Sequence, residues 1–155
     1  MIAQIKANHN LILHRQRNNI TFYAVFTNRQ EQEWSDSDLY WLSHIISAEA
    51  RGEPMEGQIA VGNVVLNRVA SSEFPNTIYD VIFDRAGGIQ FEPVGNGTVY
   101  KTPADSCVQA AKQAMSGVNV VGKSLFFFAP ALSEGTWIVN NRTYYKTIGG
   151  HQFYL

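Results

Sequence analysis

Residues 35–69 have the sequence SDSDLYWLSHIISAEARGEPMEGQIAVGNVVLNRV, which predicts two consecutive helices. The Ser35–Asp38 run supplies hydroxyls that cap a helix and carboxylates that suit the positive end of its dipole. Apolar residues then recur at helical spacing from Leu39 to Ile46, and Glu49 continues the same face. The first helix ends in the Gly52–Pro54 segment, because a residue before proline disfavours the helical region.

The second helix is expected from about Met55 to Val69 and is apolar on most of its sides. Such a helix is typical of a central position, packed by neighbours all round. Its polar exceptions include Asn63 and Asn67, which lie four residues apart and therefore on one face. The sequence leaves open whether these two amides serve the structure or face a groove.

Three further segments follow before the C-terminal third. Residues 78–82 predict a short helix, and residues 85–100, with four glycines and one proline, predict a long loop. A long loop in a compact domain is often functional. The segment Thr102–Asp105 opens another helix with a hydroxyl, a proline and an acid, and Gly117 ends it.

The C-terminal third changes to short β-type runs separated by turn residues. The runs are Leu125–Phe128, Trp137–Val139, Tyr144–Ile148 and Gln152–Leu155. Helices followed by strands predict an α+β fold, with a helical core and a small antiparallel sheet in the C-terminal third.

The first 34 residues differ in composition from the rest. They are rich in Asn, Gln and Arg, and they carry four basic and two acidic residues. We therefore expect two parts, an N-terminal appendage at 1–34 that is partly disordered and a catalytic domain at 35–155. The alternative is that Ile20–Phe26 forms a strand of the main sheet.

Composition excludes several classes of protein. Twelve Lys and Arg against thirteen Asp and Glu give a net charge of −1, which does not favour nucleic acid as a partner. No apolar run approaches the roughly 20 residues of a membrane helix, and no signal peptide is visible. The single cysteine, Cys107, excludes an intrachain disulfide and is expected in the core.

Metal and cofactor chemistry is not expected. After residue 34 the chain has two histidines, His44 and His151, without the spacing of a zinc site. No nucleophile elbow and no glycine-rich phosphate loop are present. The chemistry therefore falls to carboxylates.

Glu49 is the carboxylate that stands out. It lies on the apolar face of the first helix and in its last turn, and both positions raise the pKa of a carboxyl group. A carboxyl group that stays protonated near neutral pH suits general-acid cleavage of a glycosidic bond. The alternative from the pattern alone is a structural glutamate that pairs with Arg51 or Lys146.

Several runs of the chain together resemble the spore cortex-lytic cell wall hydrolase family. They are EARGEP at 49–54, EGQIAV at 56–61, VVLNRV at 64–69, FPNT at 74–77, VIF at 81–83, FFAP at 127–130 and IGGHQF at 148–153, with Phe91, Val94 and Trp137 between them. The resemblance spans about residues 36 to 155 and does not cover residues 1–34. Two positions, Ala129 and Tyr154, differ from the family pattern.

The resemblance implies a fold similar to lysozymes and lytic transglycosylases and an enzyme that cleaves peptidoglycan glycan strands, notably spore cortex during germination. The first glutamate of the EARGE run is the family's acid, which is Glu49 here. A lytic transglycosylase needs a single carboxyl group, because the 6-hydroxyl of muramic acid attacks the anomeric carbon. We therefore expect cleavage between N-acetylmuramic acid and N-acetylglucosamine by a monomer that acts outside the cytoplasm.

Two rival functions stay open. A lysozyme-type hydrolase would use a second carboxylate, for which Glu53, Asp80 and Asp84 are candidates. A non-catalytic glycan-binding domain would keep the cleft without the chemistry. The residues expected to contact the sugars are Phe91, Phe127, Trp137, Tyr144 and His151.

Overall fold

The computed structural model describes residues 15–16, 19–20 and 33–155, and the chain divides into two units, Met1–Glu33 and Trp34–Leu155. In the first unit, β1 (Arg15–Gln16) pairs antiparallel with β2 (Asn19–Ile20). Most of the expected appendage, including residues 21–26 of the possible strand Ile20–Phe26, lies outside the described residues. Trp34 belongs to the second unit, where its indole N–H donates to the carbonyl of Met115 at 3.1 Å.

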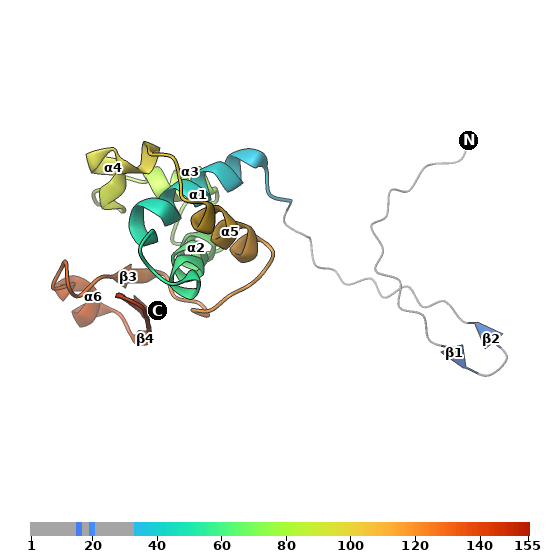
Figure 1. Ribbon diagram of the computed structural model, residues 1–155. Helices are drawn as coiled ribbons and strands as arrows, with labels where there is room; N and C mark the ends of the chain where they lie inside the picture. The colour runs from blue at the N-terminus through green and yellow to red at the C-terminus, as the bar shows by residue number, and fades with distance from the viewer. Residues whose placement is uncertain (1–14, 17–18, 21–32) are drawn as a thin grey trace. The chain divides into compact units, whose positions relative to one another are not determined.

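The two helices expected from residues 35–69 are confirmed. Helix α1 spans Asp36–Ala50 and begins with a reciprocal cap, in which Ser35 Oγ accepts from Asp38 N and Asp38 Oδ2 accepts from Ser35 N. Helix α2 spans Met55–Val69. It contacts helices α1, α3 (Ile78–Phe83) and α5 (Asp105–Met115) and strands β3 (Phe126–Phe128) and β4 (Tyr144–Ile148). It therefore occupies the central position that its composition predicted (Figure 1).

Two further helices complete the core around α2. They are α3 (Ile78–Phe83) and α5 (Asp105–Met115), and Cys107 of α5 is fully buried as expected. Gly62 of α2 lies against Ile46 of α1 and Ala114 of α5, where an added Cβ would come within 2.9 Å of Ile46. A larger residue at this crossing would push the helices apart.

The segment 85–100, expected as a loop, contains two short helical elements. Helix α4 spans Glu92–Asn96, and the 3₁₀ helix η1 spans Thr98–Tyr100. Gly97 between them has φ +80°, which favours glycine. The loop interpretation was wrong here because glycine and proline at the ends of such short helices resemble the composition of a loop.

The C-terminal third forms a three-stranded antiparallel sheet in the order β3-β5-β4. Its strands are β3 (Phe126–Phe128), β4 (Tyr144–Ile148) and β5 (His151–Tyr154). The strand expected at Trp137–Val139 was wrong, since these residues belong to helix α6 (Thr136–Asn141). Periodicity does not separate helix from strand in so short an apolar run, and the Asn141 side chain caps this helix by donating to the carbonyl of Trp137.

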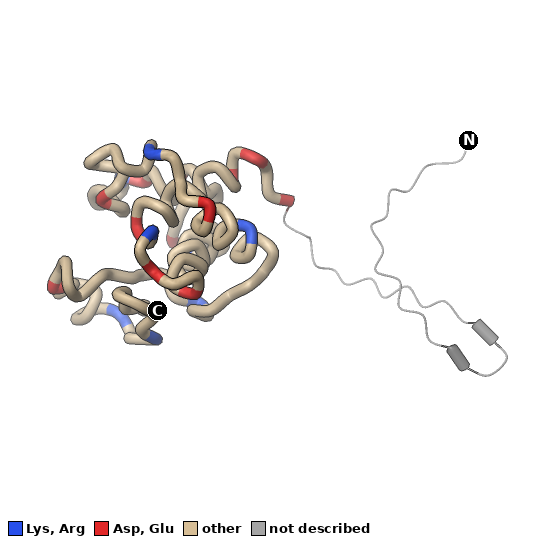
Figure 2. The backbone as a smooth tube through the Cα atoms, viewed as in Figure 1, with Lys and Arg blue, Asp and Glu red and all other residues tan. Residues whose placement is uncertain are grey.

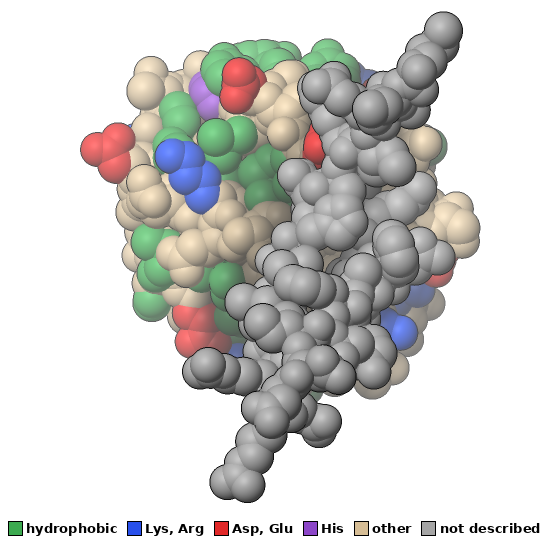
Figure 3. All heavy atoms as spheres, turned by 90° about the vertical axis from the view of Figure 1, so that its right-hand side faces the viewer, with side chains coloured by type: hydrophobic (Ala, Val, Ile, Leu, Met, Phe, Trp, Pro, Cys, Tyr) green, Lys and Arg blue, Asp and Glu red, His purple; other side chains and the backbone are tan. Residues whose placement is uncertain are grey.

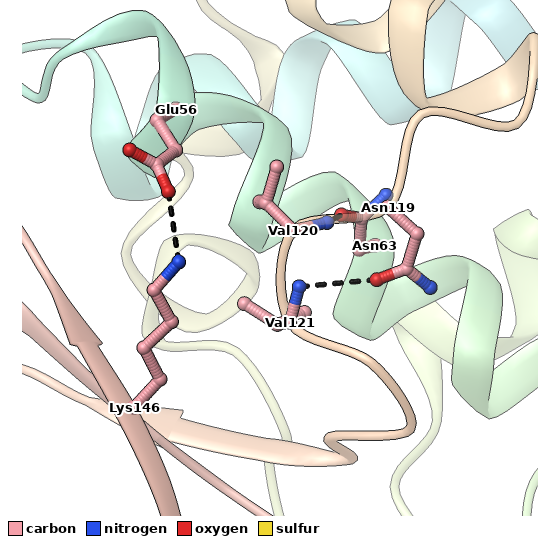
Figure 4. Close-up of polar contacts among 6 residues, drawn as sticks. All are labelled: Glu56, Asn63, Asn119, Val120, Val121 and Lys146. Atoms are coloured by element: carbon pink, nitrogen blue, oxygen red, sulfur yellow. Dashed lines mark hydrogen bonds and ion pairs between the residues drawn. The ribbon is translucent and has the colours of Figure 1, made fainter.

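The two asparagines of α2 serve the structure. Asn63 donates to the carbonyl of Val118 and accepts from Val120 N, and Asn67 donates to the carbonyls of Gly122 and Ser124. They thereby fix the segment that leads from α5 to the sheet (Figure 4). An ion pair of 2.9 Å between Lys146 of β4 and Glu56 of α2 adds a second link between sheet and helix.

Along the backbone of the Trp34–Leu155 unit, positions of Lys and Arg are interspersed with positions of Asp and Glu (Figure 2). On the part of the surface left uncovered in Figure 3, apolar side chains alternate with polar and charged ones. Within the described residues, no helix combines the length and the apolar character that crossing a bilayer requires.

Candidate active site

A cleft of about 580 Å³ lies where the end of α1 meets α4 and the end of strand β3. Glu49 and Ala48 line it from α1, Arg68 from α2, and Phe127 with His151 from the sheet. The segment Gln90–Pro93 closes another side. Residues from five separate parts of the chain therefore meet at one carboxyl group, that of Glu49.

Glu49 has an unusual protonation equilibrium. Burial, which is the largest cause, and the charge of Glu92 together raise its pKa from the ordinary value of 4.5 to about 7, while the charge of Arg68 opposes them. The raised pKa expected from the apolar face of α1 is thus confirmed, with burial as the main cause. Among the described residues no cationic side chain lies within 4.0 Å of the Glu49 carboxylate, and Lys146 pairs with Glu56 instead, so the alternative pairing of Glu49 with Arg51 or Lys146 is wrong.

Arg68 is a buried cation in the wall of the cleft, with 5% of its surface exposed. Its Nε donates to the carbonyl of Leu125 at 2.8 Å, and its guanidinium lies over the rings of Phe74 and Phe91. Burial lowers its pKa to about 10, so it stays charged at neutral pH. Its Nη1 is buried without a hydrogen-bond partner among the described residues.

Glu92 supplies a second carboxylate to the cleft. It lies in the first turn of α4, is exposed to solvent, and its charge raises the pKa of Glu49. The two carboxyl groups and Arg68 make the cleft an electrostatically coupled site.

Glu53, expected as a candidate second carboxylate, holds a turn instead of lining the cleft. Its Oε2 accepts from the backbone N–H of Gly150 at 2.8 Å, and its Oε1 lies 3.8 Å from His151 Nδ1. Gly149 has φ +55°, and an added Cβ there would collide with the Glu53 carboxylate. Glu53 therefore fixes the β4–β5 turn, from which His151 reaches the cleft.

The other candidate carboxylates also have structural partners. Asp80 accepts from the hydroxyl of Thr77 at the start of α3, and Asp84 accepts from Ala86 N. Neither residue lines the cleft, although the charge of Asp84 acts on Arg68.

The residues expected to contact sugars divide into two groups. Phe91, Phe127 and His151 line the cleft, and the ring of His151 meets that of Phe127 edge to face. Burial lowers the pKa of His151, while the charge of Glu53 opposes this. Trp137 and Tyr144 are exposed and do not line the cleft.

Two residues of the cleft, Arg68 and Glu92, received no role from the sequence. Arg68 stands in the VVLNRV run, where helical periodicity placed it beside apolar residues. Glu92 follows Phe91 in the segment that was expected to be a functional loop. A polar residue inside a mostly apolar helix was the signal for Arg68, whereas nothing local distinguished Glu92 from a surface glutamate.

No group of three or more His, Cys, Asp or Glu side chains that could hold a metal ion occurs in the described part of the chain. The titratable groups of the cleft are the carboxyl groups, the guanidinium and the imidazole named above, and Gln90, Asn96, Thr98 and Ser133 add neutral polar side chains. Their chemistry is proton transfer and hydrogen bonding to a substrate.

The chain is similar to spore cortex-lytic enzymes. It is 38% identical over 120 residues to that of Bacillus cereus and 37% identical over 122 residues to that of Oceanobacillus iheyensis. These alignments cover 77% and 79% of this chain but only 45% and 43% of the two relatives. The chain thus spans less than half of the length of these relatives.

Two solved structures have the same fold. They are the catalytic domain of the germination-specific lytic transglycosylase SleB from Bacillus anthracis, with a TM-score of 0.72 and 36% identity, and that of the Bacillus cereus SleB protein, with 0.71 and 34%. The matches cover 80% and 83% of this chain and nearly all of those domains. The expected α+β fold, a helical core with a small C-terminal sheet, is confirmed.

The model of one protein family matches residues 52–154, which is about two-thirds of the sequence. The matched range begins just after Glu49 and includes Arg68, Glu92 and His151 of the cleft. On this match, and on the identities given above, the chain belongs to the cell wall hydrolase family.

Proposed function

We propose that this protein cleaves the glycan strands of peptidoglycan between N-acetylmuramic acid and N-acetylglucosamine as a lytic transglycosylase, with Glu49 as acid and then as base. The observation that carries the proposal is the position of Glu49 in a cleft, with its pKa raised to about 7. A carboxyl group with this pKa both gives and takes a proton at neutral pH. The relatives and the SleB domains, named for cortex lysis and lytic transglycosylation, support the same reaction.

In the first step, protonated Glu49 donates its proton to the glycosidic oxygen, and the bond between that oxygen and C1 of muramic acid breaks. The Glu49 carboxylate then accepts the proton of the 6-hydroxyl, whose oxygen bonds to C1. The products are a new 4-hydroxyl and a 1,6-anhydro ring, and no water is consumed. Glu49 ends protonated and ready for another cycle.

Other residues of the cleft support these steps. The positive charge of Arg68 stabilises the Glu49 carboxylate between the two proton transfers. Phe91 and Phe127 supply apolar surface for the sugar rings. His151, held next to Phe127, is placed to hydrogen-bond a sugar hydroxyl.

A hydrolase is the second candidate, and the position of Glu92 favours it. Inverting and retaining glycosidases use two carboxyl groups, and Glu92 is the other carboxylate that lines the cleft with Glu49. In that reaction Glu92 would activate a water molecule or attack C1. Glu53 is not the second carboxylate in this proposal, because it is bound to Gly150.

The place of action follows from the substrate. The similar enzymes are named for the spore cortex, so we propose that this protein acts outside the cytoplasm, on spore cortex during germination or on the cell wall. The unit Trp34–Leu155 is proposed as the catalytic domain and residues 1–33 as an appendage.

Mass spectrometry of digestion products tests the reaction. Purified spore cortex digested with the full chain should release muropeptides that end in anhydromuramic acid, which are lighter by one water and resist borohydride. Predominantly reducible ends would overturn transglycosylation in favour of the hydrolase. The Glu49→Gln variant, digested in parallel, should release neither product.

A further inference from the structure

The cleft at Glu49 is the first of three neighbouring cavities along helix α1, each of which shares lining residues with the next. A cavity of about 250 Å³ shares Ala48 and Thr98 with the cleft, and one of about 480 Å³ shares Thr102 with that middle cavity. The middle and far cavities lie between α1 and the segment 98–103, and Thr98 of this segment also lines the cleft. The geometry points to one long groove, and we propose that it binds the peptidoglycan strand beyond the cleaved bond, with Tyr40 and Tyr100 as stacking platforms for a distal sugar.

The far cavity has the chemistry of a sugar site. Tyr40 and Tyr100 line it and expose 50% and 60% of their surfaces, although aromatic rings of this size usually pack into a core. Exposed aromatic rings of this kind pack well on the apolar faces of pyranoses. Asp36 and Thr102, on the same wall, offer hydrogen-bond partners for the hydroxyl groups at the rim of a sugar.

The rings of Tyr40 and Tyr100 are held in place by aromatic side chains packed against them. Tyr40 stacks on the buried ring of His44 at 4.1 Å, and the Nδ1–H of His44 donates to the carbonyl of Val99. Trp41 meets Tyr40 and Tyr100 edge to face, at 4.9 Å and 6.2 Å between ring centroids. Rings that are fixed before binding lose little conformational entropy when a ligand arrives.

The middle cavity carries positive charge. Arg51 and Lys101 line it, both are exposed, and neither belongs to the ion pairs formed among the described residues. Peptidoglycan carries carboxylates on its lactyl groups and stem peptides. The two cations therefore complement a peptidoglycan strand better than they complement an uncharged glycan.

The length of the groove determines which substrates reach it. Tyr40 precedes Ala48 by eight residues on α1, which corresponds to a rise of about 12 Å. A short oligosaccharide held at Glu49 does not extend to Tyr100, whereas a long strand does. The inference rests on the proposed function, because it assigns the far cavity to the same polymer.

Binding is tested in the Glu49→Gln background, so that no cleavage interferes. The probes are the trimer and the hexamer of N-acetylglucosamine, measured by calorimetry with the full chain. Changing Tyr100 to Ala should lower hexamer affinity about three- to tenfold, the value of one lost stacking contact, and leave trimer affinity unchanged. Tyr100→Phe keeps the ring and should bind the hexamer as the parent does.

Tyr79→Ala is the matched control. Tyr79 is 48% exposed and packs on the same Trp41, but it lines none of the three cavities, so its loss should not change hexamer affinity. Equal losses in Tyr79→Ala and Tyr100→Ala, or a trimer loss equal to the hexamer loss, would overturn the groove. In a pull-down with insoluble peptidoglycan, replacing Arg51 and Lys101 by Gln should weaken binding at low salt more than at high salt.

The experiments test the groove proposal and the proposed reaction independently. If cortex digestion gave no cleavage while the hexamer still bound through Tyr100, the groove would stand and the enzymatic proposal would fall. If cleavage were normal while hexamer and trimer bound alike in every Tyr100 variant, the groove would fall and the enzyme would stand.

Discussion

Glu49 and Glu53 lie four residues apart, and the fold gives their carboxyl groups opposite surroundings. Glu49 is half-buried in the cleft, outside the ion pairs of the described residues, and has a raised pKa. Glu53 accepts a hydrogen bond from Gly150 N and faces His151. The same residue type is thus left available for chemistry at one position and used for structure at the other.

The break in the helix produces this difference. In a continuous helix, residues four apart share one face and both carboxyl groups would point the same way. Helix α1 ends at Ala50, and α2 begins at Met55 after Pro54, so Glu53 turns toward the β4–β5 turn. The break between α1 and α2 thus turns the Glu53 carboxylate away from the cleft and leaves Glu49 as the carboxyl group with the raised pKa.

The largest expected effect is on activity. Glu49→Gln keeps the shape of the side chain and removes the proton, so peptidoglycan lysis should fall by about two to four decades while the fold is retained. Release of soluble muropeptides measures the rate, and circular dichroism checks the fold. Glu53→Gln is the control, since an amide oxygen still accepts from Gly150, and it should keep most of the activity. Equal losses of lytic activity in Glu49→Gln and Glu53→Gln would contradict the assignment of chemistry to Glu49 and structure to Glu53.

The second effect is on stability as a function of pH. The folded state holds a proton on Glu49 up to about pH 7, whereas the unfolded chain releases it near 4.5. The contribution of Glu49 to the free energy of unfolding therefore falls as pH rises through this range, by roughly 3 kcal/mol at most and less where solvent screens the half-buried group. Glu49→Gln should match the wild type below pH 4.5 and be more stable above pH 7. Denaturant unfolding at a series of pH values measures this, and parallel curves for the two proteins would contradict a raised pKa.

The surroundings of Glu49 could be predicted well from the sequence. The cap at Ser35, the apolar spacing and the break at Gly52–Pro54 are local, so they identify α1, α2 and the raised pKa of Glu49. The sequence offered Glu53 as a candidate second carboxylate and did not identify its partner Gly150, which lies 97 residues away. Long-range partners of this kind arise from tertiary packing, which no local pattern encodes.

The same limit explains the residues that sequence analysis missed or misplaced. Arg68 and Glu92 become part of the site only when α2 and α4 meet the end of α1. Trp137 was expected among the sugar contacts as part of a strand, but it lies on α6, outside the cleft. Helix α6 begins directly after Gly135, whose φ is +56°.

A third and smaller effect tests the turn that Glu53 holds. Gly149→Ala puts a Cβ against the Glu53 carboxylate at a φ of +55°, and the backbone strain alone should cost about 1–2 kcal/mol. Gly52→Ala is the matched control, because nothing lies within 4 Å of its Cβ and its φ is not positive. Thermal unfolding should show a lower Tm for the first variant and little change for the second. If the two melt alike, the positive φ at Gly149 and its close approach to Glu53 are contradicted.

The smallest expected effect is a shift in the pH dependence of kcat/KM, which distinguishes the role of Glu92 from that of Glu49. Lysis requires protonated Glu49, so kcat/KM should decline as pH rises through about 7. The charge of Glu92 raises the pKa of Glu49, and Glu92→Gln should therefore move this decline to lower pH, more at low salt than at high salt because Glu92 is exposed. Glu56→Gln is the control, since Glu56 pairs with Lys146 away from the cleft and should leave the decline in place. A loss of several decades at every pH in Glu92→Gln would instead make Glu92 the second carboxylate of a hydrolase, and Glu49 would no longer act alone.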